Sequence, residues 1–240
     1  MPTSTPTPSN TPTPTPTPVP PAPTQTKACL GAAFQSDEAF TTTIADWAGM
    51  DGGDLFDGTT AATRTAFSQL SEALRTGMIP RSALDWDEDE VARAFSAGDL
   101  LFAKLRASSQ FGAEAWAKSA PWPGGGELIG HGLAVSAYGR NLATAIDVIA
   151  WLTDDPQQME RFTDSGLGPV SSQAYQSPPL VDSVFALAVA QAKPRLSRSY
   201  YHQLETAVAE VGRPILLGQT TAQEALPRLA ERLAGILAGG

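Results

Sequence analysis

The chain has 240 residues, with 16 Lys and Arg against 25 Asp and Glu, which gives a formal net charge of -9 and a pI near 4.7. Nucleic acids and anionic membranes both attract a clustered positive field, so this charge balance argues against either as a partner. Cys29 is the only cysteine in the sequence, which excludes an internal disulfide and a metal site built from cysteines.

The first stretch, residues 2–23, consists almost entirely of Thr and Pro. Proline fixes φ and lacks a backbone donor, and no side chain here is apolar and larger than Val19, so burial cannot offset the cost of ordering. We therefore expect residues 1–28 to form a disordered, extended tether ahead of a globular domain at 29–240. No signal peptide, lipid-attachment site or membrane span is recognisable, because no sufficiently long apolar run occurs.

Apolar spacing and capping residues predict a helix-rich domain with few strands. Residues 34–50 are weakly patterned and end in a turn at 51–54. Two short strands are predicted at 100–105 and 128–136. Gly212 and Pro214 should kink or end the helix in which they lie, and Pro227 should disturb the last helix of the chain. The predicted helices run from Thr59 or Thr60 to Gly77, Asp85 to Gly98, Asn141 to Leu152, onward from Pro156, Leu180 to Ala192, Tyr200 to about Leu217, and Ala222 to Leu237.

A search for reactive motifs is negative. His131 and His202 are the only histidines, and no Gly-x-Ser-x-Gly sequence accompanies them. The glycine run 124–126 is followed by Glu127 and not by Lys-Ser or Lys-Thr, so it does not match a phosphate-binding loop. The acidic run 85–90 suits the start of a helix, where carboxylates complement the dipole. We expect no catalytic residue, no cofactor and no metal ion.

Six segments, taken in order, resemble the C-terminal half of the extracellular solute-binding proteins of sugar ABC transporters. The resemblance covers nearly all of the predicted domain, from residue 52 to residue 237. The segments are Gly52 to Asp57, which resembles the Gly-Gly-Asp turn of that family, the helix Ala66 to Pro80, the helix Asp85 to Asp99, the stretch Ile129 to Ser136, the helix Asn141 to Pro156, and Gly168 to Val170.

The resemblance implies an α/β fold of the periplasmic-binding-protein type, helix-rich and present only in part. The family has two lobes joined by crossing strands. By the resemblance, residues 52–106 and 175–240 belong to the second lobe and residues 130–167 to the first, and much of the first-lobe sheet lies outside this sequence.

The same resemblance implies a function and a set of ligand-binding residues. The chain would be the substrate-binding component of a sugar ABC importer, or a fragment of it. It would bind a sugar or oligosaccharide non-covalently between the lobes, dock to ABC permease subunits, and work outside the cytoplasm at the cell surface. The ligand-binding residues carried over are Gly53, Asp54, Arg106, Gly130 and His131, of which Arg106 and His131 stand where the family often has stacking aromatics.

Two alternatives remain open. The loss of both stacking aromatics and of a lobe fits a truncated or degenerate copy that serves as a surface-tethered interaction domain without sugar affinity. An enzyme of another kind would need a reactive constellation, and the sequence shows none.

Overall fold

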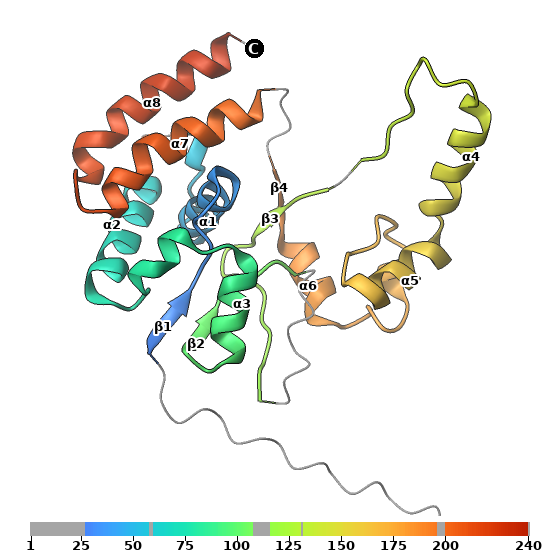
Figure 1. The fold of residues 1–240 in the computed structure, drawn as a ribbon, viewed down its shortest axis with the longest axis horizontal. Coiled ribbons are helices and arrows are strands. Elements are labelled where there is room, and N and C mark those ends of the chain that lie inside the picture. Colours follow the sequence, from blue (N-terminus) through green and yellow to red (C-terminus); the bar gives the residue numbers. More distant parts are fainter. Residues whose placement is uncertain (1–26, 58–59, 108–115, 131, 196–199, 240) are drawn as a thin grey trace, which may run out of the picture.

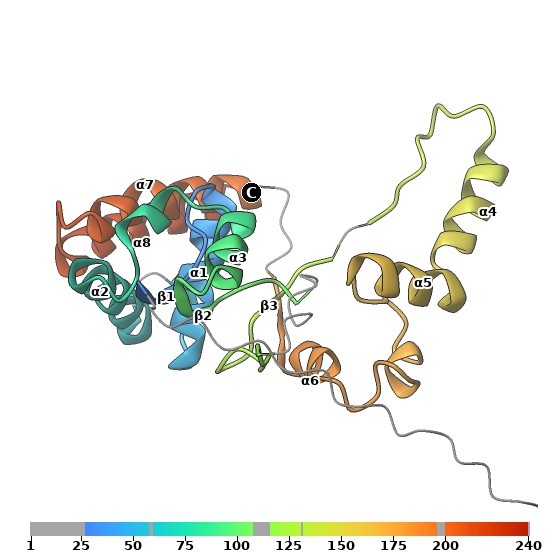
Figure 2. The same ribbon diagram turned by 60° about the horizontal axis from the view of Figure 1, so that its bottom comes forward.

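The computed structural model describes residues 27–57, 60–107, 116–130, 132–195 and 200–239. The described chain has two parts, visible in Figures 1 and 2. Residues 27–106 and 200–239 form a helical body, and residues 129–192 form an arm that extends away from it in both views. Of the tether expected at residues 1–28, residues 1–26 lie outside the described part of the chain.

The body begins with a short strand that sequence analysis did not predict. Strand β1, Ala28–Gly31, pairs in parallel with β2, Leu100–Ala103, and Ala28 lies opposite Leu100. Ala28 is buried, so the expected tether boundary is wrong for this residue: the β1–β2 pair stabilises it. A Cβ at Gly31 would lie 2.4 Å from a terminal methyl of Leu100, so the Leu100 side chain occupies the space beside this glycine.

Helix α1, Asp37–Met50, was also missed, and its burial explains why. The Ser36 hydroxyl caps the helix by accepting from the Ala39 backbone N–H at 3.0 Å. Phe40 and Ile44 are fully buried, but so are three polar side chains on other faces, Thr41, Thr43 and Asp46. A helix that is buried on several sides gives no clear amphipathic period.

Three further helices complete the core of the body around α1. These are α2, Ala61–Thr76, α7, Tyr201–Leu216, and α8, Ala222–Ala238, as predicted within two residues. Gly212 and Pro214 were expected to kink or end α7, and the helix runs through both. The helix ends only two residues after Pro214, so the missing donor affects its last turn alone. Helix α8 likewise continues through Pro227, and a capping box between Thr221 and Glu224 stabilises its start.

Short elements connect these helices. Helix α3, Glu88–Ser96, starts at a capping box in which Asp87 and Glu90 satisfy each other's backbone donors, and it packs on β1 and β2. The acidic run is therefore a helix cap, as expected. Two 3-10 helices, Leu55–Asp57 (η1) and Arg81–Asp85 (η2), flank α2.

The arm carries less regular structure than was predicted. Strand β3, Glu127–Leu128, pairs in parallel with β4, Lys193–Pro194, and the strand expected to reach Ser136 has only these two residues. Pro194 has no N–H to donate, which limits the ladder. The helices are α4, Leu142–Leu152, α5, Asp155–Ser165, and α6, Val184–Gln191, with a 3-10 helix η3 at Ala174–Gln176.

An aromatic cluster joins η3, α5 and α6. The ring centroid of Phe185 lies 5.1 Å from that of Phe162 and 6.3 Å from that of Tyr175, and the Tyr175 hydroxyl donates to the Pro169 carbonyl at 2.9 Å. Residues 174–191 therefore pack with the arm. We propose that the chain changes lobe at β4, and not before Tyr175 as the resemblance implied.

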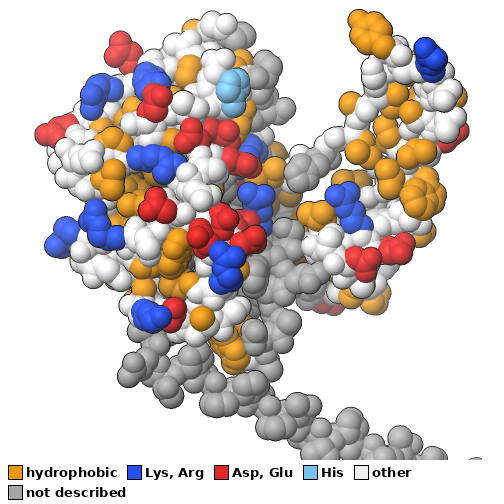
Figure 3. Space-filling view, viewed as in Figure 1, with side chains coloured by type: hydrophobic (Ala, Val, Ile, Leu, Met, Phe, Trp, Pro, Cys, Tyr) orange, Lys and Arg blue, Asp and Glu red, His pale blue; other side chains and the backbone are white. Residues whose placement is uncertain are grey.

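Helix α4 is rich in apolar residues but carries no buried residue in the described structure. Ile146 is 59% exposed and Trp151 57% exposed, and Figure 3 shows apolar side chains gathered along the arm.

No described helix has the length and apolar character needed to cross a bilayer.

Candidate functional site

The arm and the body meet at β3 and β4, which we call the crossing strands. A tight glycine turn leads into β3. Gly124 and Gly125 both have positive φ, and a Cβ at Gly124 would lie 2.6 Å from the Gly49 carbonyl oxygen. At Gly125 a Cβ would collide with the Gln191 carbonyl. The glycine run therefore allows close backbone packing against α1 and α6.

Asp46 of α1 fixes the start of β3. This carboxylate is buried, and its Oδ1 accepts from the Glu127 backbone N–H at 2.9 Å. Its Oδ2 pairs with the Lys104 ammonium at 2.8 Å, and its backbone carbonyl accepts from Trp122 Nε1 at 3.0 Å. One residue thus holds three segments of the chain that are far apart in sequence.

Arg195, which follows β4, is the centre of a second polar cluster. Its guanidinium donates from Nε to Glu127 Oε2 at 3.0 Å and from Nη1 to Glu38 Oε1 at 3.0 Å. Glu205 Oε1 lies 3.8 Å from Nη1, and the Tyr201 ring centroid is 5.2 Å from Cζ. The Arg195 side chain is 13% exposed and that of Glu127 12% exposed. We call these five residues the Arg195 cluster.

The Arg195 cluster has more negative than positive groups. Three carboxylates surround one guanidinium, which leaves a charge of about -2 when all are ionised. Burial raises the pKa of the Glu127 carboxyl, although Arg195 acts in the opposite direction. Burial likewise raises the pKa of Glu205, and the charges of Glu38 and Glu127 add to the effect.

Tyr201 has a buried hydroxyl that lacks a hydrogen-bond partner within the described structure. Its pKa is raised, first by burial and then by the Glu127 carboxylate. The ring packs edge-on against Phe56, with 5.6 Å between centroids. An unsatisfied buried hydroxyl costs free energy, so Tyr201 lowers the stability of this cluster unless a water reaches it.

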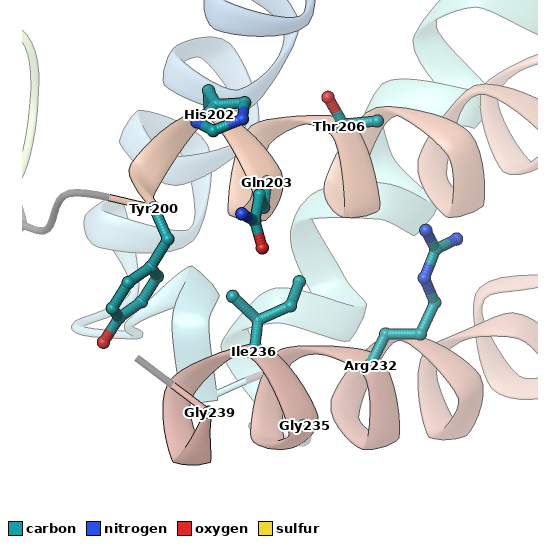
Figure 4. A pocket seen from close by; sticks show the side chains of 8 residues that line it. All are labelled: Tyr200, His202, Gln203, Thr206, Arg232, Gly235, Ile236 and Gly239. Atoms are coloured by element: carbon teal, nitrogen blue, oxygen red, sulfur yellow. The ribbon is translucent and has the colours of Figure 1, made fainter.

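The body has two hollows, one at the start of α1 and one between α7 and α8. The smaller, of about 240 Å³, is lined by Gln35 and Ser36 at the start of α1 and by Arg106, whose Nε pairs with Glu88 Oε2 at 3.0 Å. The larger, of about 710 Å³, lies between α7 and α8 (Figure 4). Gln203 of α7 and Ile236 of α8 point toward each other across it.

The ligand-binding residues carried over by resemblance do not meet in one place. Arg106 lies at the N-terminus of α1, whereas Gly53 and Asp54 follow its C-terminus, about 20 Å away along a 14-residue helix. Asp54 Oδ1 accepts locally from the Phe56 N–H at 2.9 Å. Gly130 follows β3, with no heavy atom within 4 Å of a Cβ placed there, and His131 lies outside the described residues.

Sequence reasoning missed the Arg195 cluster because its members come from four segments with no common motif. Strand β4, which positions Arg195, was not predicted either, so no local signal pointed to this residue. Within the described residues, no group of three His, Cys, Asp or Glu side chains is placed to hold a metal ion.

A family model described as "Bacterial extracellular solute-binding protein" matches residues 22–186. The chain belongs to this family of binding proteins. A search of curated protein sequences found no match. The fold class expected from the sequence is confirmed: a helix-rich, partial fold of the periplasmic-binding-protein type.

Solved structures share the fold of this family member. Maltose-bound MalE3 of T. maritima aligns with a TM-score of 0.74 and 18% identity, over 87% of this chain and 60% of that one. An ABC transporter solute-binding protein of Thermotoga lettingae bound to alpha-D-tagatose gives 0.73 and 17%, over 88% and 59%. The GacH receptor of Streptomyces glaucescens, solved unliganded and with acarbose, gives 0.68 and 19%, over 88% and 59%. The chain thus spans about three fifths of the length of these proteins.

Proposed function

We propose that this chain is the substrate-binding component of a sugar ABC importer, or a part of one, and that it binds a carbohydrate non-covalently. The observation that carries the proposal is the family match over residues 22–186. The solved proteins with the same fold support it, because they were solved with maltose, alpha-D-tagatose and acarbose bound. The proposal includes ABC permease subunits as partners and a location outside the cytoplasm.

We place the proposed ligand site where the crossing strands meet the N-terminal half of α1. A sugar needs directed hydrogen bonds for its hydroxyls and a flat apolar surface for its C–H face. Glu38 supplies a carboxylate, and its side chain is 42% exposed. Tyr200 adds an aromatic ring at the larger hollow, and Arg106 adds a cation at the smaller one.

Of the residues carried over by resemblance, Arg106 and Gly130 stay in the proposed site, and a ligand-binding role of His131 rests on the resemblance alone. Gly53 and Asp54 do not, because they lie beyond the other end of α1 and Asp54 is engaged in its own turn. Binding without covalent chemistry agrees with the family, whose members are solute-binding proteins.

The test is thermal unfolding of the chain with maltose, maltotriose, tagatose and acarbose, followed by calorimetric titration of any sugar that acts. A ligand at a hundred times its Kd adds about 2.7 kcal/mol, which raises Tm by roughly 5 to 11 °C for a domain of this size. The variant Glu38→Gln should weaken binding by about ten-fold if this carboxylate accepts from a sugar hydroxyl. The variant Glu210→Gln, on the exposed part of α7, is the control and should bind like the wild type.

The second candidate is a surface-tethered interaction domain without sugar affinity. The observation that favours it is the apolar, exposed surface of α4 in a chain that spans three fifths of its structural neighbours. A cooperative unfolding transition that no sugar moves would support this candidate over the first.

A further inference from the structure

The two crossing strands are too short to hold each other. The β3–β4 ladder has two residue pairs, flanked by hydrogen bonds from the Lys193 N–H to the Gly126 carbonyl at 2.9 Å and from the Arg195 N–H to the Leu128 carbonyl at 3.1 Å. An isolated pair of strands is marginally stable at best in water, and parallel pairs normally lie within larger sheets. Other contacts must therefore fix these strands on the body.

The Asp46 carboxylate holds the start of β3, and side chains of the Arg195 cluster supply contacts for both strands. Arg195 reaches α1 through Glu38, α7 through Glu205, and the neighbouring strand through Glu127. The Glu127 carboxylate also accepts from the Thr42 hydroxyl at 3.3 Å, which ties β3 to α1 a second time. Charge-assisted hydrogen bonds in a partly buried site are stronger than neutral ones, and the guanidinium fork fixes their direction.

The anchoring stops abruptly beyond β3. The side chain of Ile129 is 37% exposed, and Gly130 has open space around it. Gly132 is equally open, so the chain that leaves β3 toward α4 makes few contacts there. A segment with few side-chain contacts and two glycines bends more readily than one held by ion pairs.

We propose that Arg195 is a positioning residue that clamps both crossing strands onto α1 and α7. Motion of the arm relative to the body then takes place beyond the clamp, first at residues 129–130 on the β3 side. Under the proposed function, the clamp keeps Glu38 in place while the arm moves. That consequence rests on the proposed function, whereas the anchoring itself is tested without any ligand.

The test is hydrogen exchange of the full chain, followed by mass spectrometry, for the wild type and three variants. In Arg195→Met, exchange at the amides of Glu127, Lys193 and Arg195 should accelerate by on the order of ten-fold or more, while the α7–α8 and β1–β2 peptides stay within about two-fold of wild type. Arg195→Lys should give an intermediate effect, because an ammonium can pair with a carboxylate but lacks the planar fork. Arg232→Met is the control, since it removes an equal charge from an exposed ion pair with Glu210.

Two results would overturn the clamp. One is unchanged exchange at the crossing strands in Arg195→Met, and the other is an equal acceleration throughout the body, which would indicate general destabilisation. If Arg195→Met does not fold, Glu127→Gln replaces it and should accelerate exchange at residues 127–128 alone; no acceleration there also refutes the clamp. A chain that binds no sugar but shows the local exchange pattern refutes the proposed function and retains the clamp.

Discussion

Gly212 and Gly235 lie inside helices α7 and α8, yet we expect replacement by alanine to have opposite effects on folding stability at the two positions. A Cβ at Gly212 would lie 2.7 Å from ring carbons of both Phe40 and Phe67, which are fully buried on α1 and α2. A Cβ at Gly235 would meet nothing within 4 Å.

The magnitudes follow from two competing terms. Replacing glycine by alanine inside a helix stabilises by about 1 kcal/mol, because the unfolded chain loses freedom. Overpacking a core costs about 1 to 3 kcal/mol when rigid rings cannot move aside. Gly235→Ala should therefore gain about 1 kcal/mol and raise Tm by about 2 to 4 °C. Gly212→Ala should instead show a net loss of up to about 2 kcal/mol and lower Tm by up to about 8 °C.

Urea denaturation followed by circular dichroism measures both changes, with thermal unfolding as a second readout. Equal slopes of free energy against urea would show that the unfolded ensembles are comparable. The interpretation of Gly212 as a close-packing residue would be refuted if Gly212→Ala were as stable as Gly235→Ala.

Two further predictions concern the polar clusters. Burial raises the folded pKa of Glu205, so the folded state takes up a proton before the unfolded state does, and stability should rise as the pH falls from about 7 toward about 5. Glu205→Gln should flatten this slope in urea titrations at both pH values; an unchanged slope would exclude Glu205 as its source. Lys104→Met leaves the Asp46 carboxylate buried without its cation and should cost about 3 kcal/mol. The double variant Lys104→Met with Asp46→Asn should recover part of that loss in urea titrations. No recovery would contradict an electrostatic origin of the lost stability.

Much of the body could be predicted from sequence because its signals are local. Helices α2, α3, α7 and α8 each have a cap or an apolar stripe within their own residues, and these were found within a few positions. Gly212 and Pro214 indicated a kink or an end of α7, but the neighbours that Gly212 meets lie on α1 and α2, and no local pattern reports them.

The sequence by itself determined the family, the helix-rich fold class and most helix positions, because family motifs and helical periods are short-range patterns along the chain. Only the tertiary structure decided the rest. Strand β1 exists because β2, about 70 residues later, pairs with it. Arg195 meets Glu38 across 157 positions of sequence and Glu127 across 68. Contacts between such distant residues depend on how the elements pack, and the packing energy that selects them is not encoded in any single segment.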